Sequence, residues 1–190
     1  MIISFYTLNT PYEQEVQNLI QSCHKFQLQT QIEGRPSVGS WTANCAVKPF
    51  YILEKLHQLQ RPLLWVDADA VFLKKPDLSF LHPYDLSVRI NSGFSWEDTS
   101  KVISNTVYIN YTPVALRLVE KWAKGCQRRL KKDPCTWDQA VLRDVLRREK
   151  EAKILPMPVA YSKIYDLDVF LIEQSDVVIE HYQASRRYAD

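Results

Sequence analysis

Two aspartates separated by one alanine follow an apolar run in the segment RPLLWVDADAVFLKKP, residues 61–76. Such a run is typical of a strand buried on both faces, and ligands of open α/β sheets bind beyond the carboxyl ends of strands. In an extended chain, Asp67 and Asp69 would face the same side. Adjacent carboxylates repel each other unless a cation compensates, and their oxygens suit Mg²⁺ or Mn²⁺. The spacing therefore predicts a divalent-cation site. The alternative is a pair of aspartates that cap a turn or that pair with Lys74 and Lys75.

Strand and helix patterns alternate around this segment. The expected strands are 2–8, 28–33, 63–66, 84–90, 106–110, 153–158 and 176–181. The expected helices are 12–26, 49–60, 113–131 and 137–149, where apolar residues recur at helical spacing. The alternation predicts an α/β fold over residues 1–190 as a single domain, with a mostly parallel central sheet flanked by helices. Residues 91–104 form the longest irregular connection, which is either a binding element or a plain connector.

Composition narrows the class of protein. The chain has 190 residues, of which 46% are hydrophobic, and this is enough for one sizeable core. Because 24 Lys and Arg residues nearly balance 22 Asp and Glu residues, bulk charge does not indicate nucleic-acid binding. Basic residues gather in 121–132 and 143–150, as solvated helix faces or as a surface for an anionic membrane or acidic acceptor. The cysteine spacing and the apolar N-terminus suggest a soluble cytoplasmic enzyme.

One interpretation of the aspartate pair is a phosphatase. The stretch WVDADAV resembles the nucleophile motif of the haloacid-dehalogenase family, in which a strand precedes D-x-D-x-[T/V]. The resemblance implies that Asp67 attacks phosphorus and that Asp69 acts as acid and base. In that family, however, the motif lies on the first strand, whereas here two strand-helix units precede it. This favours a different family.

A second resemblance covers residues 41–187. The block NCAVKPFYILEKLHQLQRPLLWVDADAVFLKKP resembles the helix, strand and D-x-D of type A (GT-A) nucleotide-sugar glycosyltransferases, especially the family 8-like retaining enzymes. ISNTVYINYTPVALRLVEKW resembles their N-x-G strand and following helix, TWDQAVL their D-Q helix start, and IEHYQASRR their late histidine motif. The blocks occur in the order found in the family. The resemblance implies a GT-A-like, Rossmann-type fold and sugar transfer from a nucleoside-diphosphate sugar.

The resemblance also implies residue roles. Asp67 would contact ribose or metal, Asp69 would bind the metal, and His181 would be a third ligand at a carboxyl edge of the sheet. An imidazole beside two carboxylates favours Mn²⁺ over Mg²⁺. Asp138 and Gln139 would lie beside the donor sugar as catalytic residues. The other expected donor-binding residues are Lys48, Trp41, Asn44, Arg186 and Arg187.

The chain departs from the family pattern at Asn105, where N-x-G has glycine. Asn tolerates left-handed backbone, so we expect the turn to be kept. No extra carboxylate stands out as a general base, which favours a retaining transfer from a UDP- or GDP-sugar. The acceptor hydroxyl could belong to a glycan, a lipid or a protein, and a catalytically degenerate binding module is the non-enzymatic alternative.

Overall fold

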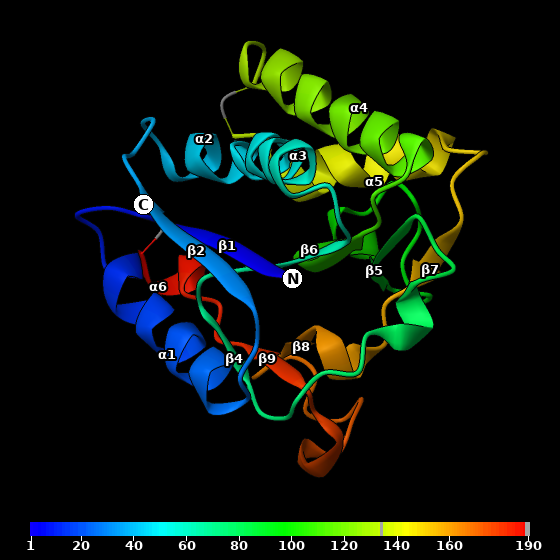
Figure 1. The fold of residues 1–190 in the computed structure, drawn as a ribbon. Helices are drawn as coiled ribbons and strands as arrows, with labels where there is room; N and C mark the ends of the chain where they lie inside the picture. The colour runs from blue at the N-terminus through cyan, green and yellow to red at the C-terminus, as the bar shows by residue number, and fades with distance from the viewer. Residues whose placement is uncertain (134, 189–190) are drawn as a thin grey trace.

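The computed structural model describes residues 1–133 and 135–188, and these have a mixed α/β fold (Figure 1). The helices are α1 Tyr12–Lys25, α2 Trp41–Ala46, α3 Lys48–Leu59, α4 Pro113–Leu130, α5 Asp138–Arg148 and α6 Ser185–Tyr188. The strands are β1 Ile2–Thr7, β2 Thr30–Arg35, β3 Leu63–Val66, β4 Ala70–Phe72, β5 Leu86–Ile90, β6 Val102–Ile109, β7 Ile154–Pro156, β8 Lys163–Ile164 and β9 Ile179–His181. Among the described helices, none is both long enough and apolar enough to cross a membrane.

The central sheet confirms the predicted architecture. Within the described residues its order is β2-β1-β3-β6-β5-β7, and β6 runs antiparallel to both of its neighbours. The remaining pairs, β1 with β2, β1 with β3 and β5 with β7, are parallel, so the sheet is mostly parallel as expected. Helices α2 to α5 lie over one face of the sheet, and α1 lies on the other (Figure 1).

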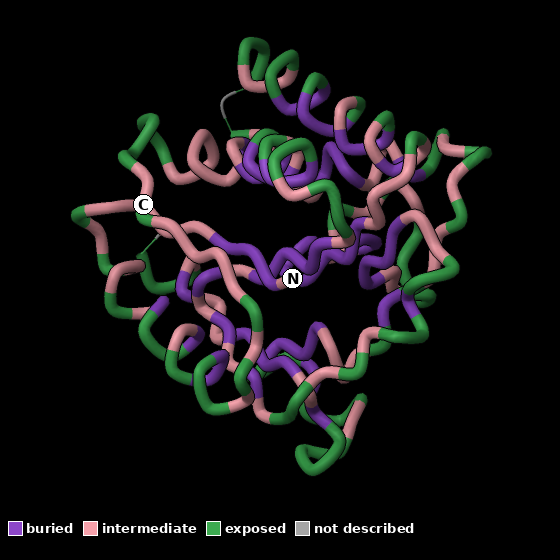
Figure 2. The backbone as a smooth tube through the Cα atoms, viewed as in Figure 1, coloured by how far each residue is buried: buried purple, intermediate pink, exposed green. Residues whose placement is uncertain are grey.

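Strand β3 is buried on both faces, as its apolar run predicts. Leu63 and Trp65 pack into the core beneath α3, α4 and α5, whereas Leu64 and Val66 pack into the core on the side of α1. The side chains of a strand alternate between its two faces, so a central strand with a core on either side must be apolar throughout. Figure 2 shows the strands at the middle of the molecule as its most continuously buried part.

Strand β6 differs from the prediction in a way that bears on the site. It begins at Val102, four residues before the expected start, and so shortens the predicted 91–104 connection. Its pairing with β5 jumps from Val107 to Ile103, which leaves residues 104–106 without partners on β5. This is a β-bulge, a feature that re-aims side chains next to functional sites. Asn105 lies inside the strand and does not have the left-handed backbone expected for it.

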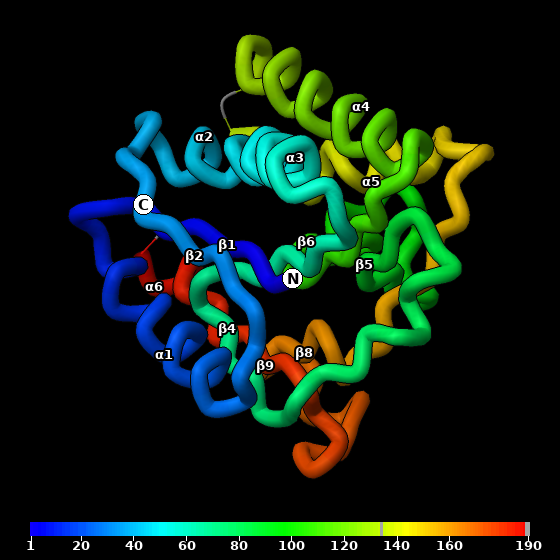
Figure 3. The backbone as a smooth tube through the Cα atoms, in the orientation of Figure 1, coloured from blue at the N-terminus to red at the C-terminus, as the bar shows by residue number. Residues whose placement is uncertain are grey.

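The predicted last strand does not join the central sheet. The strand expected at 176–181 forms only as β9, which lies between β4 and β8 in a separate three-stranded sheet. Strands β4 and β9 are distant in sequence but lie side by side (Figure 3). The expectation that His181 ends a strand of the main sheet is therefore wrong. Short strands such as β4 and β8 carry too few residues for their alternation to be recognised.

A buried ion pair connects the central sheet to the segment after β8. Asp168 makes two hydrogen bonds with the guanidinium of Arg89 on β5, and its Oδ2 also accepts the backbone N–H of Ile164 at 2.7 Å. Both charged side chains are almost completely shielded from solvent. Burial would raise the pKa of Asp168, but Arg89 and the Ile164 amide outweigh it and hold the pKa below its ordinary value.

Replacing Asp168 tests this pair. Asp168→Ala leaves the Arg89 charge buried without a partner, and we expect the free energy of unfolding to fall by roughly 3–5 kcal/mol at pH 7 in urea titrations. Because the folded-state pKa is lowered, the contribution of Asp168 is complete above about pH 4 and disappears as the pH falls through that lowered value. The difference from wild type should therefore shrink in acid. Asp176→Ala, which removes an exposed carboxylate nearby, is the control, and an equal loss in both variants would contradict the assignment.

Candidate active site

One cavity of about 510 Å³ lies beyond the ends of β1 and β3. These strands end beside α2, the start of α5 and the segment after β9. The cavity is therefore lined by residues that are far apart in the sequence. Of the predicted site residues, it is lined by Trp41, Asn44, Lys48, Asp67, Asp69, Asp138, Gln139 and Arg186. His181 does not line the cavity and is fully buried behind it.

Asp67 and Asp69 reach this cavity through a turn. The backbone N–H of Ala70 donates to the carbonyl oxygen of Asp67 at 3.2 Å, so residues 67–70 form a tight turn between β3 and β4. The extended conformation expected for the D-x-D stretch is therefore wrong, although both side chains still line the same cavity. The Asp67 carboxylate accepts a hydrogen bond at Oδ1 from the indole N–H of Trp65, at 2.7 Å.

The Lys48 ammonium lies between two carboxylates. Its Nζ is 3.0 Å from Asp67 Oδ1 and 3.3 Å from Asp138 Oδ2, and it also donates to the backbone oxygen of Ser104 at 3.2 Å. The Ser104 hydroxyl in turn donates to Asp138 Oδ2 at 3.0 Å. Lys48 and Asp138 are both buried, and a buried ion pair of this kind needs such additional hydrogen bonds. The partner of Asp67 is therefore Lys48, and the alternative pairing with Lys74 and Lys75 does not occur.

These surroundings raise the pKa values of both Lys48 and Asp67, for different reasons. Burial alone would lower the pKa of Lys48, but the carboxylates of Asp138 and Asp67 outweigh it and raise the pKa. Burial raises the pKa of Asp67, and the Asp69 carboxylate adds to this against the opposing Lys48 charge. Lys48 thus compensates the negative charge of Asp67 only in part. A carboxylate in this condition stabilises an added cation.

Three polar residues that sequence reasoning did not assign come from the bulge of β6. Ser104 contacts Lys48 and Asp138, Asn105 accepts the Ser162 hydroxyl at 2.5 Å, and the Thr106 hydroxyl lies 2.8 Å from His181 Nε2. All three are buried. The signal that could have revealed them is a run of polar residues inside the otherwise apolar stretch VISNTVYI, since buried polar groups need partners.

The contacts of His181 and Asp69 indicate whether a divalent cation fits between these two side chains. His181 Nδ1 is a buried ring nitrogen that has no hydrogen-bond partner among the described residues. It lies 3.8 Å from Asp69 Oδ1, too far for a hydrogen bond, while Asp69 Oδ2 accepts the Ala184 N–H at 2.7 Å. Burial would raise the pKa of Asp69, but His181 and the Ala184 amide hold it below its ordinary value. An unpartnered nitrogen facing a carboxylate oxygen fits a shared divalent cation.

The predicted three-ligand set is nevertheless not assembled. In the described part of the chain, no group of three or more His, Cys, Asp or Glu side chains is arranged to hold a metal ion. Asp67 directs Oδ1 to Lys48 and Trp65, so Asp69 and His181 are the two residues that fit best.

The other predicted residues also have partners within the protein. Trp41 donates from Nε1 to the Tyr12 hydroxyl at 3.2 Å, and its ring packs edge-on against Trp137. Asn44 Oδ1 accepts the N–H of Val38, which fixes the loop before α2. The remaining contacts are Gln139 Oε1 with the Ser104 N–H at 3.2 Å, Arg186 with Asp166 at 2.5 Å and Arg187 with Glu15 at 2.9 Å.

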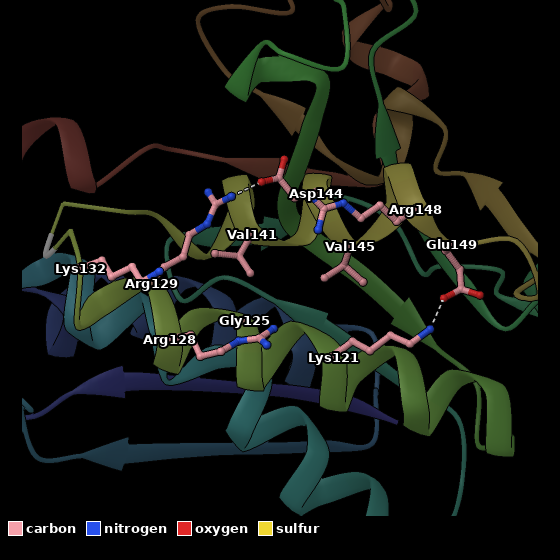
Figure 4. A pocket seen from close by; sticks show the side chains of 10 residues that line it. All are labelled: Lys121, Gly125, Arg128, Arg129, Lys132, Val141, Asp144, Val145, Arg148 and Glu149. Atoms are coloured by element: carbon pink, nitrogen blue, oxygen red, sulfur yellow. Dashed lines mark hydrogen bonds and ion pairs between the residues drawn. The ribbon is translucent and has the colours of Figure 1, made fainter.

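A second cavity, of about 620 Å³, lies between α4 and α5 (Figure 4). It contains none of the predicted site residues. Its basic side chains include those noticed in the sequence, but Lys121 pairs with Glu149 at 2.8 Å and Arg129 pairs with Asp144. The groove is therefore a mixed-charge surface with Val141 at its apolar wall.

Comparison with known proteins decides between the enzyme classes. A sequence model of the nucleotide-diphospho-sugar transferases matches residues 19–184. The chain belongs to this family. A solved structure, titled as a glycosyltransferase involved in the glycosylation of the major capsid of PBCV-1, shares its fold with a TM-score of 0.70. The alignment covers 96% of this chain and 91% of that one at 13% identity. A search of curated proteins gave no match.

The glycosyltransferase assignment agrees with the fold and removes the phosphatase alternative. The D-x-D turn follows the third strand of the chain, after two strand-helix units, as the resemblance to type A transferases implies. The nucleotide-sugar donor follows from the family, and the cavity beyond β1 and β3 is the candidate site for it.

Lys48→Met should destabilise the transferase because it leaves Asp138 buried without its cation. We expect the free energy of unfolding in urea to fall by roughly 3–5 kcal/mol. Adding Asp138→Asn should recover part of this loss, since the second change removes the uncompensated charge. Lys124→Met, which breaks an exposed pair with Glu120, should cost no more than about 0.5 kcal/mol. Strictly additive losses in the double variant would show that Lys48 and Asp138 do not act as a pair.

Proposed function

We propose that this glycosyltransferase is metal-dependent and moves a sugar from a nucleoside-diphosphate sugar to an acceptor hydroxyl. The observation that carries the proposal is the Asp67-Asp69 turn, which lies in a cavity with the unpartnered Nδ1 of His181 beside Asp69. Asp69 and His181 would hold the cation, and Asp67 would add a carboxylate oxygen or contact ribose. The set of nitrogen and oxygen donors favours Mn²⁺.

A bound divalent cation would neutralise charge on the leaving diphosphate as a Lewis acid. The residues of the chain perform the remaining tasks. Lys48 is a positioning residue, because its contacts fix Asp67, Asp138 and β6 relative to one another. Tyr6, Tyr12 and Trp41 line the cavity, and their aromatic rings suit a flat nucleotide base. A UDP- or GDP-sugar meets these requirements.

We also propose that the transfer retains the configuration of the sugar. Among the described residues that line the cavity, the carboxylates are Asp67, Asp69 and Asp138. Asp138 is held by Lys48 and Ser104, while the other two belong to the proposed metal and donor site. This leaves the leaving diphosphate to accept the proton of the acceptor hydroxyl, as in a retaining transfer. Gln139 lies at the start of the same helix and would help to orient the donor sugar.

A thermal-shift screen tests the metal and the donor together. Nucleoside-diphosphate sugars are added to the transferase with and without Mn²⁺, and we expect one donor to raise the melting temperature only when Mn²⁺ is present. Asp69→Asn should abolish that rise because it removes a metal-binding oxygen and the local negative charge. Asp77→Asn, at an exposed position, is the matched control and should respond like wild type. A full response in Asp69→Asn would remove Asp69 from the site.

Thr106→Val tests how His181 is prepared for metal binding. When Nε2 donates its hydrogen to the Thr106 hydroxyl, Nδ1 carries the free lone pair that faces Asp69. Losing that hydroxyl should weaken Mn²⁺ binding about tenfold or more in calorimetry on the donor-free protein. Thr106→Ser keeps the hydroxyl and should bind Mn²⁺ like wild type. Equal affinity in the valine variant would show that Thr106 does not orient the ring.

A further inference from the structure

The segment after β8 turns its apolar side chains to solvent. Phe170 is 97% exposed, and its neighbours Leu167, Val169 and Leu171 are 59%, 50% and 61% exposed. We refer to these four residues as the apolar loop. Single exposed apolar side chains are ordinary, but four within five positions form a patch of the kind that marks an interaction site.

The apolar loop is held in place by Asp168, which lies between Leu167 and Val169 in the sequence and points inward. Asp168 is buried, pairs with Arg89, and accepts the N–H of Ile164 through Oδ2. The backbone N–H of Leu171 donates to the Asp168 carbonyl at 3.0 Å, which closes the turn. An anchored loop that keeps apolar side chains in water is pre-organised for binding, because little conformational freedom remains to be lost.

The apolar loop is continuous with the candidate active site. Leu167 lines the same cavity as Asp67 and Asp69, and Trp137, which is also exposed, lines it too. An acceptor hydroxyl must enter this cavity to reach the donor sugar. The part of the acceptor that remains outside the cavity then meets the rim at Leu167 and the exposed side chains that follow it.

The charges around the apolar loop narrow the kind of ligand. The ionisable side chains in 165–176 are the phenol of Tyr165 and the carboxylates of Asp166, Asp168, Glu173 and Asp176. Asp166 pairs with Arg186 and Asp168 pairs with Arg89, so Glu173 and Asp176 supply the net negative charge of the segment. Acidic side chains are repelled by an anionic membrane surface. The mixed-charge groove between α4 and α5 lies across the central sheet from β8, so its basic side chains do not lie beside the apolar loop (Figure 1). A neutral apolar group on an individual acceptor molecule suits this surface.

Building on the proposed function, we propose that the acceptor is amphiphilic. Its hydroxyl-bearing head enters the cavity, and its alkyl or aryl group packs on the apolar loop. The structure thereby assigns acceptor binding to residues 167–171, a segment outside the donor and metal residues. The loop is fixed before the acceptor arrives, so the apolar group gains affinity without ordering any chain.

The test compares two probes that share a head group, hexyl β-D-glucopyranoside and methyl β-D-glucopyranoside, below the micellar concentration. Backbone and indole N–H signals of the isotopically labelled chain are followed by NMR. We expect saturable shifts at residues 165–171 and at the Trp137 indole, with affinity for the hexyl probe about tenfold or more above the methyl probe, which is about 1.4 kcal/mol. Phe170→Ser/Leu171→Ser should abolish this gain. Phe94→Ser, which alters another exposed loop phenylalanine, should keep it.

Each contrary result overturns the proposal. Equal affinity for the two probes, no shift at the loop, or a gain that survives in Phe170→Ser/Leu171→Ser removes the apolar site. Loop shifts that leave the Trp137 indole unmoved remove its connection to the cavity. Two further results would assign the loop to another partner. Either the wild type, but not the double variant, sediments together with neutral phosphatidylcholine vesicles, or the wild type, but not the double variant, sediments as a dimer. Failure of the wild-type response to donor and Mn²⁺ is measured separately and counts against the proposed function instead.

Discussion

The buried ammonium of Lys48 is the interaction on which the candidate site depends. It joins four parts of the chain, namely the start of α3, the end of β3, the bulge of β6 and the start of α5. Without a cation in this place, the carboxylates of Asp67 and Asp138 would face each other at the carboxyl end of an apolar strand. The Ser104 hydroxyl also donates to Asp138. The position of the Asp138 carboxylate and the path of the β6 backbone therefore depend on each other.

The site also lies at the junction of two sheets. Asp69 belongs to the turn by which the chain leaves the central sheet and enters the small one, and His181 lies opposite Ala70 in the small sheet. Thr106, which contacts His181, belongs to the central sheet. A ligand held between Asp69 and His181 therefore also connects the two sheets. The Ala184 amide bound to Asp69 adds a second connection to the same segment.

The sequence predicted the central elements because their signals are local. The apolar run before Asp67 identified a strand with a core on both faces, and the helical spacing of apolar residues identified α1, α3, α4 and α5. The features that the sequence did not reveal depend on partners that are distant in the chain. The polar residues Ser104 and Asn105 resemble a loop until their buried partners are known. The small sheet forms from short strands whose pairing no local periodicity reveals. For the same reason the sequence did not reveal that Lys48, which lines the cavity as expected of a donor-binding residue, also contacts Asp67, Asp138 and Ser104.

The bulge of β6 has a consequence for how this enzyme could diversify. Residues 104–106 take no part in the pairing with β5, and of these only Thr106 is paired with β3. Substitutions at positions 104 and 105 would therefore act on the contacts with Asp138 and Ser162, and not on the strand registers that hold the sheet together. Thr106 is constrained twice, by the sheet and by His181. A single strand thus contains neighbouring positions under different constraints. Ser104 and Asn105 are held by side-chain partners around the cavity, whereas Thr106 is held by the sheet as well.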